Sequence, residues 1–285
     1  MSYQIITDSC SDLTEAQLQS LQVSCANLTV MYNGENHTSF SEPTAVKAFY
    51  DEIRGGVMAT TAAANPDDWA GIMKPALEEG RDVLVITFSG GMSTTYQSAV
   101  IASKDLQEEY PQRKIIVIDS LAAALGQGLL VYHACRKRDE GMGIEELAAW
   151  VEENKFHVAH WVTVDDLTHL KRGGRISATS AIVGSMLNIK PIIHVDNDGH
   201  LINTAKVRGR KAAMEYLTKK FTETCTDFDT VFIGHGDCEA EAQAMAETIK
   251  TRFGVKHVFI NYVGAVIGAH TGPGVLVVFF MGTAR

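Results

Sequence analysis

The sequence lacks any long apolar run and is short of positive charge. No uninterrupted apolar stretch approaches the roughly 20 residues that a membrane-spanning helix needs. Lysine and arginine number 25 against 34 aspartates and glutamates, which leaves a formal net charge of −9. An acidic surface of this kind repels phosphate backbones and anionic lipid headgroups. We therefore expect no binding to nucleic acid and only transient contact with membranes.

Cysteines are few and show no pairing pattern. The five cysteines are an odd number, and no Cys-x-x-Cys occurs. A disulfide framework is not expected, and a reducing compartment fits better. Residues 1–8 have neither the positive segment nor the long apolar segment of a signal peptide. Together these features predict a cytoplasmic protein. Cys10 could act as a nucleophile, but no histidine motif is tied to it, and a small buried thiol is the favoured interpretation.

Motifs of nucleotide-binding proteins and serine hydrolases are also absent. There is no G-x-x-x-x-G-K-[ST] phosphate loop and no G-x-G-x-x-G after a strand. There is no G-x-S-x-G nucleophile elbow either. Nucleotide binding by this chain alone is therefore unsupported, and no cofactor is expected. The stretch 235–238 (HGDC) could hold a metal in principle, but we expect no metal site.

Short apolar runs alternate with amphipathic helical stretches, which predicts an α/β protein. The length of 285 residues suits two domains. We place an N-terminal domain with a largely parallel sheet at 1–157 and a C-terminal domain with a mixed sheet at 158–285. Predicted strands lie at 3–7, 26–32, 82–88, 114–119, 157–164, 191–195, 200–208, 230–235, 257–263 and 275–280. Predicted helices follow a capping box at 14–17 and lie at 43–53, 66–79, 95–109, 121–139, 144–154, 178–187, 209–225 and 239–253.

The ends of the early strands indicate where a site should be sought. The runs 83–86, 115–118 and 275–280 are almost wholly apolar, which is typical of strands buried on both faces. The first strand and the strands at 82–88 and 114–119 end in small polar residues. In doubly wound sheets, ligands bind beyond the carboxyl ends of the strands. A binding site is therefore expected at these ends.

Two hydroxyl-rich segments precede predicted helices. In the segment 89–97 (SGGMSTTYQ), glycines permit a tight turn, and Ser93 and Thr94 offer hydroxyls at a helix start, where an anion is favoured. Ordinary helix capping explains the same residues equally well. In the segment 60–66 (TTAAANP), Thr61 could face a ligand, although a plain capped loop is the simpler interpretation.

Cationic and histidine side chains occur in three further turns. Arg172 and Arg175 flank two glycines, and an arginine can clamp a carboxylate or phosphate in a bidentate manner. Arg208 and Arg210 lie where a helix begins, against its dipole, so an anionic partner would explain them. His270, expected in the loop 268–274, could donate a hydrogen bond to an anion. Taken singly, each also fits a solvated turn or a structural histidine.

Taken in order along the chain, these motifs resemble the DegV family. The matching stretches are 6–13 (ITDSCSDL), 61–66 (TAAANP), 93–98 (STTYQS), 117–120 (VIDS), 170–177 (LKRGGRIS), 187–191 (LNIKP) and 270–274 (HTGPG). The resemblance covers nearly the whole chain. It implies two α/β domains with a long-chain fatty acid between them. It also implies the role of binding subunit in a bacterial fatty acid kinase, which belongs to phospholipid metabolism.

In that role a carrier without catalytic activity presents the acyl carboxylate to a separate ATP-using kinase and then holds the acyl phosphate. The resemblance assigns carboxylate binding to Thr61, Ser93 and His270, with Thr94 beside them. It assigns the basic turn to Arg172 and Arg175. It associates Arg208 and Arg210 with binding of the kinase or its phosphate.

Two loops depart from the family pattern, and two other functions remain open. Residues 61–66 read TAAANP where TSQPSP is usual, and 90–95 read GGMSTT where SGLSGT is usual. These departures leave the acyl-chain preference undetermined. Ser93 and His270 could instead form the nucleophile and base of an acyl hydrolase, although no third orienting group is identifiable. The chain could also be a binding module for another anionic small molecule.

Overall fold

A parallel four-stranded sheet forms the first half of the protein. The computed structural model describes residues 3–38, 43–165, 167–176 and 188–285. All three strand pairings in this sheet are parallel. The buried apolar runs of its central strands agree with the prediction of strands covered on both faces. The strands, in spatial order, are β2 (Val23–Ala26), β1 (Tyr3–Asp8), β6 (Asp82–Thr87) and β7 (Ile115–Asp119).

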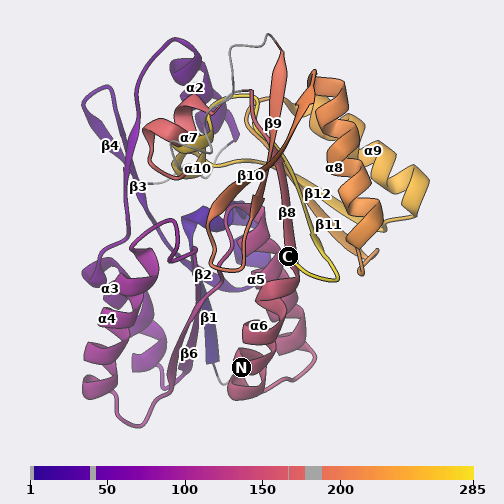
Figure 1. Cartoon of the computed structure of the whole chain (residues 1–285). Helices are drawn as coiled ribbons and strands as arrows, with labels where there is room; N and C mark the ends of the chain where they lie inside the picture. Colours follow the sequence, from indigo (N-terminus) through magenta and orange to yellow (C-terminus); the bar gives the residue numbers. More distant parts are fainter. Residues whose placement is uncertain (1–2, 39–42, 166, 177–187) are drawn as a thin grey trace.

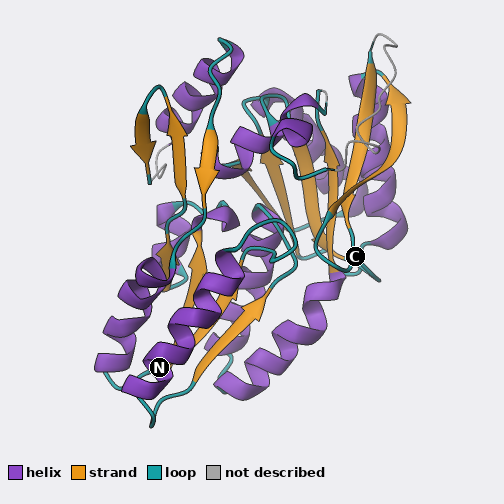
Figure 2. Ribbon diagram, turned by 60° about the vertical axis from the view of Figure 1, so that its left-hand side comes forward, coloured by secondary structure: helices purple, strands orange, loops and turns teal. Residues whose placement is uncertain are grey.

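Helices cover both faces of this sheet, as Figures 1 and 2 show. Capping boxes at Thr14–Gln17 and Asn65–Asp68 fix the starts of α1 and α3, as the sequence predicts. The strand order changes sense between β1 and β6, because β2 is added on one side of β1 and β6 on the other, and ligands bind at such a switch point. The helices are α1 (Glu15–Ser20), α3 (Pro66–Glu78), α4 (Thr95–Glu109), α5 (Leu125–Asp139) and α6 (Ile144–Asn154).

A mixed six-stranded sheet forms the second half. Only the β11–β12 pairing is parallel, and the other four pairings are antiparallel. Helices α8 (Arg210–Thr224) and α9 (Glu239–Phe253) pack on one face. Helix α5 packs against β8, β11 and β13, so it links the two sheets. The strands, in spatial order, are β10 (Leu201–Arg208), β9 (Ile189–Val195), β8 (Val158–Thr163), β13 (Leu276–Met281), β11 (Thr230–His235) and β12 (His257–Tyr262).

Short elements complete the fold above the first sheet. Three antiparallel strands form a small sheet in the order β4 (Glu35–His37), β3 (Thr29–Tyr32) and β5 (Thr60–Ala62). Helices α2 (Pro43–Arg54), α7 (Thr168–Arg172) and α10 (Ala265–Thr271) lie together beside it (Figure 1). Two one-turn helices, η1 (Ser9–Ser11) and η2 (Lys155–His157), follow β1 and α6.

Three predicted elements differ from the structure. The single strand expected at 26–32 is two strands in different sheets, because the chain turns at Leu28, whose amide donates to Ser9 Oγ (3.0 Å). The helix expected from residue 121 begins at Leu125. Leu121 and Ala124 have φ of 52° and 53°, which no right-handed helix contains. The predicted helix 178–187 falls outside the described residues.

Six short elements were not predicted: β4, β5, α7, α10, η1 and η2. The prediction that His270 lies in a loop is wrong, since this histidine lies in the last turn of α10. The strands of the two large sheets come from residues before and after 157 respectively, but the division into domains at that residue stays a prediction. None of the described helices is long and apolar enough to cross a membrane.

Candidate functional site

A cavity of about 450 Å³ lies between the two sheets, at the carboxyl ends of β6 and β7. Most of its wall is apolar and comes from both halves of the chain. The apolar lining residues are Leu28, Ala63, Phe88, Met92, Ala123, Ala124, Val162, Leu170, Ile193, Val195, Leu201, Val263, Val266, Ile267, Val275, Val277 and Phe279. The other described lining residues are Thr61, Gly90, Ser93, Thr94, Gln97, His160, Arg175, His270 and Thr271.

Thr61 and His270 meet in this wall. Thr61 lies on β5 and His270 on α10, and 2.8 Å separates Thr61 Oγ1 from His270 Nε2. The two residues stand 209 positions apart in the chain, and the small sheet and α10 bring them together. Both side chains are half-buried, which leaves them able to contact a molecule in the cavity.

His270 is held neutral. Burial lowers the pKa of its imidazole to about 4, and the positive charge of Arg175 acts in the same direction. Its Nδ1 is buried and has no hydrogen-bond partner. A side chain on Gly173 would place its Cβ 2.2 Å from that atom, so only glycine fits beside the ring. The turn after α7 therefore packs directly against the imidazole and fixes its position.

Ser93 and Thr94 stand at the start of α4. Ser93 Oγ lies 2.8 Å from Thr95 Oγ1 and accepts the Thr95 amide at 3.2 Å. Thr94 is exposed, and its side chain makes no capping bond. The first amides of a helix have no intrahelical acceptor, and the helix dipole favours a negative charge there. The segment therefore combines the expected capping with an anion-binding surface.

Arg175 joins the two halves at the same place. Its Nε donates to the Met92 carbonyl (3.1 Å), and its Nη1 donates to the Gly173 carbonyl (2.5 Å). Met92 precedes Ser93, so the guanidinium lies close to the start of α4. Hydroxyls, an imidazole and a guanidinium thus share one region of an otherwise apolar cavity. This arrangement can hold an anionic group on a long apolar chain.

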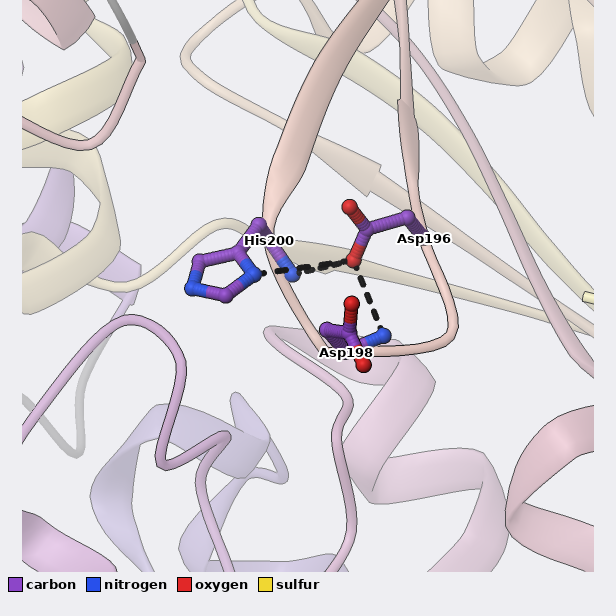
Figure 3. A group of neighbouring side chains, drawn as sticks. All are labelled: Asp196, Asp198 and His200. Atoms are coloured by element: carbon purple, nitrogen blue, oxygen red, sulfur yellow. Dashed lines mark hydrogen bonds and ion pairs between the residues drawn. The ribbon is translucent and has the colours of Figure 1, made fainter.

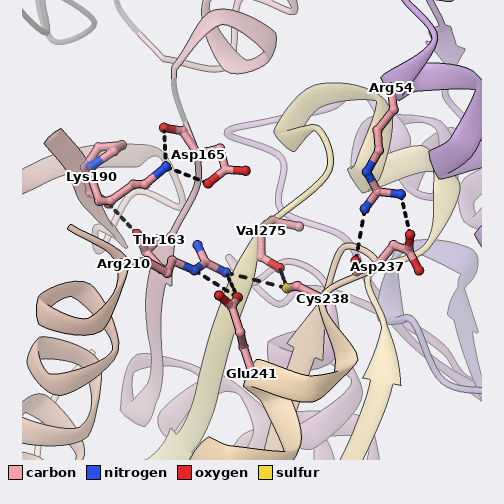
Figure 4. Close-up of polar contacts among 10 residues, drawn as sticks. Arg54, Thr163, Asp165, Lys190, Arg210, Asp237, Cys238, Glu241 and Val275 are labelled. Carbon is pink, nitrogen blue, oxygen red and sulfur yellow. Dashed lines mark hydrogen bonds and ion pairs between the residues drawn. The ribbon is translucent and has the colours of Figure 1, made fainter. Parts of the chain in front are cut away.

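The remaining predicted cations lie outside the cavity lining. Arg172 is exposed at the end of α7, and Arg208 is exposed at the end of β10. Arg210 donates to Glu241 Oε2 from Nε (2.9 Å) and Nη2 (2.6 Å), and it also contacts Cys238 (Figure 4). Its guanidinium is therefore already engaged in an ion pair within the second half.

The described contacts do not join Ser93 to His270. Each is paired elsewhere, Ser93 with Thr95 and His270 with Thr61, and His270 Nδ1 has no group to orient it. A hydrolase would need the opposite arrangement. Cys10 is fully buried, and burial raises the pKa of its thiol well above the ordinary value, so it is not poised as a nucleophile.

One group of described side chains has the composition of a metal site. Asp196, Asp198 and His200 gather at the turn between β9 and β10 (Figure 3). Asp196 Oδ1 already accepts the amides of Asp198 (3.0 Å) and His200 (2.8 Å). This is the usual way in which an aspartate stabilises a hairpin turn, and these contacts account for the group. The stretch 235–238 does not form such a group.

Most of the cavity wall could not be located from sequence. The apolar lining residues are ordinary strand and helix residues whose patterns indicate burial but not a cavity. His160 is a polar residue of the wall, but nothing in the sequence around it indicates a cavity. It lies on β8, donates from Nδ1 to Val158 O (2.9 Å) and accepts the Ala123 amide at Nε2 (3.2 Å). Both nitrogens are thereby satisfied inside the cavity wall.

The fold and the cavity define a class: α/β proteins with an apolar ligand cavity between a parallel and a mixed sheet. The model of the family described as "Uncharacterised protein, DegV family" matches residues 2–283. A DegV domain-containing protein of Clostridium perfringens is 40% identical over 284 residues, which cover 99% of this chain and 98% of that protein. The chain belongs to the DegV family.

Solved structures agree over the whole chain. A DegV family protein from Thermus thermophilus, described as binding fatty acid, is 30% identical with a TM-score of 0.87 over 99% of this chain and 100% of that one. A DegV lipid-binding protein from Thermotoga maritima is 28% identical with a TM-score of 0.87 over 100% of both chains. The predicted α/β fold, with one parallel and one mixed sheet, is confirmed.

Proposed function

We propose that this protein is a cytoplasmic carrier that binds one long-chain fatty acid by its carboxylate. The observation that carries the proposal is the meeting of Thr61, Ser93, Arg175 and His270 in the wall of one apolar cavity. The relatives from Thermus thermophilus and Thermotoga maritima support it, since they bind fatty acid and lipid. The neutral donors Thr61, Ser93 and His270 would hold the carboxylate directly, while the guanidinium of Arg175 donates to the Met92 and Gly173 carbonyls.

The size of the cavity suits such a ligand. About 150 Å³ of apolar cavity holds a benzene ring, so a volume three times larger has room for on the order of 18 carbon atoms. The roughly 14 methylenes of a 16-carbon chain, at about 0.8 kcal/mol each, contribute at most about 11 kcal/mol. Ordering the chain and the protein reduces this. The remainder is enough for tight retention.

We further propose that the carrier presents the carboxylate to a separate ATP-dependent kinase and then holds the acyl phosphate. The exposed cations Arg172 and Arg208 support this, because they lie beyond the cavity and are open to a partner. Arg210 contributes less than the sequence suggested, since Glu241 neutralises it. The chain itself carries no phosphate loop, so the ATP-using chemistry belongs to the partner.

Mass spectrometry of the freshly purified protein tests the binding proposal. We expect one fatty acid per chain, released by solvent extraction. Ser93→Ala removes a donor to a charged group, which typically costs about 1.5–3 kcal/mol, so binding should weaken by roughly ten- to a hundredfold. Ser103→Ala, two turns further along the same helix and outside the cavity lining, is the control and should bind normally. An empty protein that takes up no added fatty acid would refute the proposal.

The kinase step needs its own measurement. With ATP and a candidate kinase, the loaded protein should yield acyl phosphate, which hydroxylamine traps. Arg208→Glu should slow this step while leaving fatty acid binding unchanged, because the side chain lies outside the cavity lining. Lys219→Glu, an exposed charge reversal further along α8, serves as the control. Equal rates of acyl phosphate formation in both variants would show that Arg208 does not contact the kinase.

A further inference from the structure

Arg285 is a half-buried cation whose hydrogen bonds within the described part of the chain reach no carboxylate. Burial lowers the pKa of its guanidinium to about 10, while Asp119 and Asp196 act in the opposite direction from a distance. Its donors go instead to backbone carbonyls: Nη2 to Ser120 (3.2 Å) and Lys155, and Nη1 to Leu121 and Asp196 (3.5 Å). Its Nε is buried without a partner. Withdrawing a charge from water costs free energy unless polar groups compensate it, and here four backbone carbonyls do so.

The carbonyls that Arg285 binds belong to loops that pack against one another. We call residues 89–92, 119–124 and 196–199 the loop junction. Ser89 Oγ donates to Gly199 O (2.8 Å), and the Ser89 amide donates to Ala122 O (3.0 Å). A Cβ on Gly199 would lie 2.2 Å from Ser89 Oγ and 3.2 Å from Leu121 Cα. The three loops are therefore in direct contact, and only glycine fits between them.

The loop junction forms part of the cavity wall. Ala123 and Ala124 line the cavity from the second loop, and Gly90 and Met92 line it from the first. The second loop is strained, since Leu121 and Ala124 both have left-handed φ without being glycine. Ser93 follows the first loop directly. A strained segment persists only where its surroundings hold it. Arg285 makes four hydrogen bonds to backbone carbonyls, and three of these carbonyls belong to the loop junction.

We propose that Arg285 is a positioning residue that holds the loop junction closed against the cavity and thereby sets how fast the ligand leaves. The inference rests on the proposed fatty acid binding. Arg285 touches no ligand-facing donor. It acts through the carbonyls of Ser120, Leu121 and Asp196, which fix the wall formed by Ala123 and Ala124. Loss of the guanidinium releases the strained loop and opens the cavity on that side.

Arg285→Lys tests the proposal, because an ammonium cannot reach the same spread of carbonyls in a planar fork. The first measurement is the release of radiolabelled palmitate from the loaded protein into an excess of unlabelled palmitate. We expect release at least tenfold faster than from the wild type. The second is amide hydrogen exchange of the peptide covering residues 119–125, without ligand. We expect a loss of protection in this peptide and in the peptide that covers residues 196–199, because Arg285 binds a carbonyl in each.

Arg138→Lys is the matched control. Arg138 is more buried than Arg285 and likewise donates to a backbone carbonyl, Leu21 O (2.8 Å), but it is also paired with Asp139 (3.0 Å) and lies outside the cavity lining. It should lower stability without changing palmitate release or exchange at 119–125. Unchanged release and exchange in Arg285→Lys would overturn the inference while leaving the carrier function intact. A wild type that binds no palmitate would overturn the proposed function, and with it the role of Arg285 in release.

Discussion

The imidazole of His270 is uncharged at neutral pH. Burial and the nearby Arg175 hold its pKa at about 4, whereas a histidine in an unfolded chain titrates near 6.5. As the pH falls below 6.5, the unfolded state takes up a proton that the folded state refuses, and folding stability declines until about pH 4. The neutral form is present throughout the physiological range, so donation to a carboxylate does not require a protonated ring.

His270→Gln should therefore flatten the acid side of the stability profile. Between pH 7 and 4 the free energy of unfolding of the wild type should fall by roughly 3 kcal/mol more than that of the variant. Urea unfolding at each pH measures both. Burial raises the pKa of Asp8 to about 6, which acts in the opposite sense, but this contribution is common to both proteins and cancels in the comparison. Parallel profiles would contradict the buried, neutral assignment.

At the scale of single elements, the turn after α7 positions the site. Gly173 has ordinary backbone dihedrals but no room for a Cβ beside His270, whereas Gly174 has φ of +70° and open space around it. Gly173→Ala should displace His270 and weaken fatty acid binding by roughly ten- to a hundredfold, the cost of one hydrogen bond to a charged group. Gly174→Ala should cost about 1 kcal/mol of stability through its left-handed backbone and leave affinity unchanged. Titration with a fluorescent fatty acid compares the affinities of the two variants. Equal affinities would contradict the positioning of His270 by Gly173.

Elements with strong local signals were predictable, and the site elements were not. Helices α4, α6 and α9 and strand β11 have the predicted bounds, because the pattern of apolar residues that marks each of them lies within the segment itself. Strand β5 has three residues and α10 has seven, too few for a period to show. Thr61 and His270 were singled out from sequence, but their contact spans 209 positions, and no local pattern encodes it. Arg285 carried no signal at all, because its role depends on distant carbonyls.

At the scale of the whole molecule, the cavity exists because two sheets face each other across α5 and the loop junction. Its apolar wall draws on residues from position 28 to position 279. Each strand alone shows only that a face is buried, and the space between the faces depends on how both halves pack. The volume that sets the acyl-chain length is therefore a property of the assembled fold.

That dependence on volume yields a test on the strand β10. Leu201 lines the cavity and is only half-buried, so a larger side chain can be accommodated without overpacking the core. Leu201→Phe adds three carbon atoms. At about 25 Å³ of cavity per carbon, scaled from benzene in 150 Å³, the retained fatty acid should be shorter by roughly three carbons. Ile202→Phe, on the exposed face of the same strand, is the matched control and should retain the wild-type ligand. Mass spectrometry of the extracted acids decides the matter, since an unchanged chain length in Leu201→Phe would mean that the chain runs elsewhere than along β10.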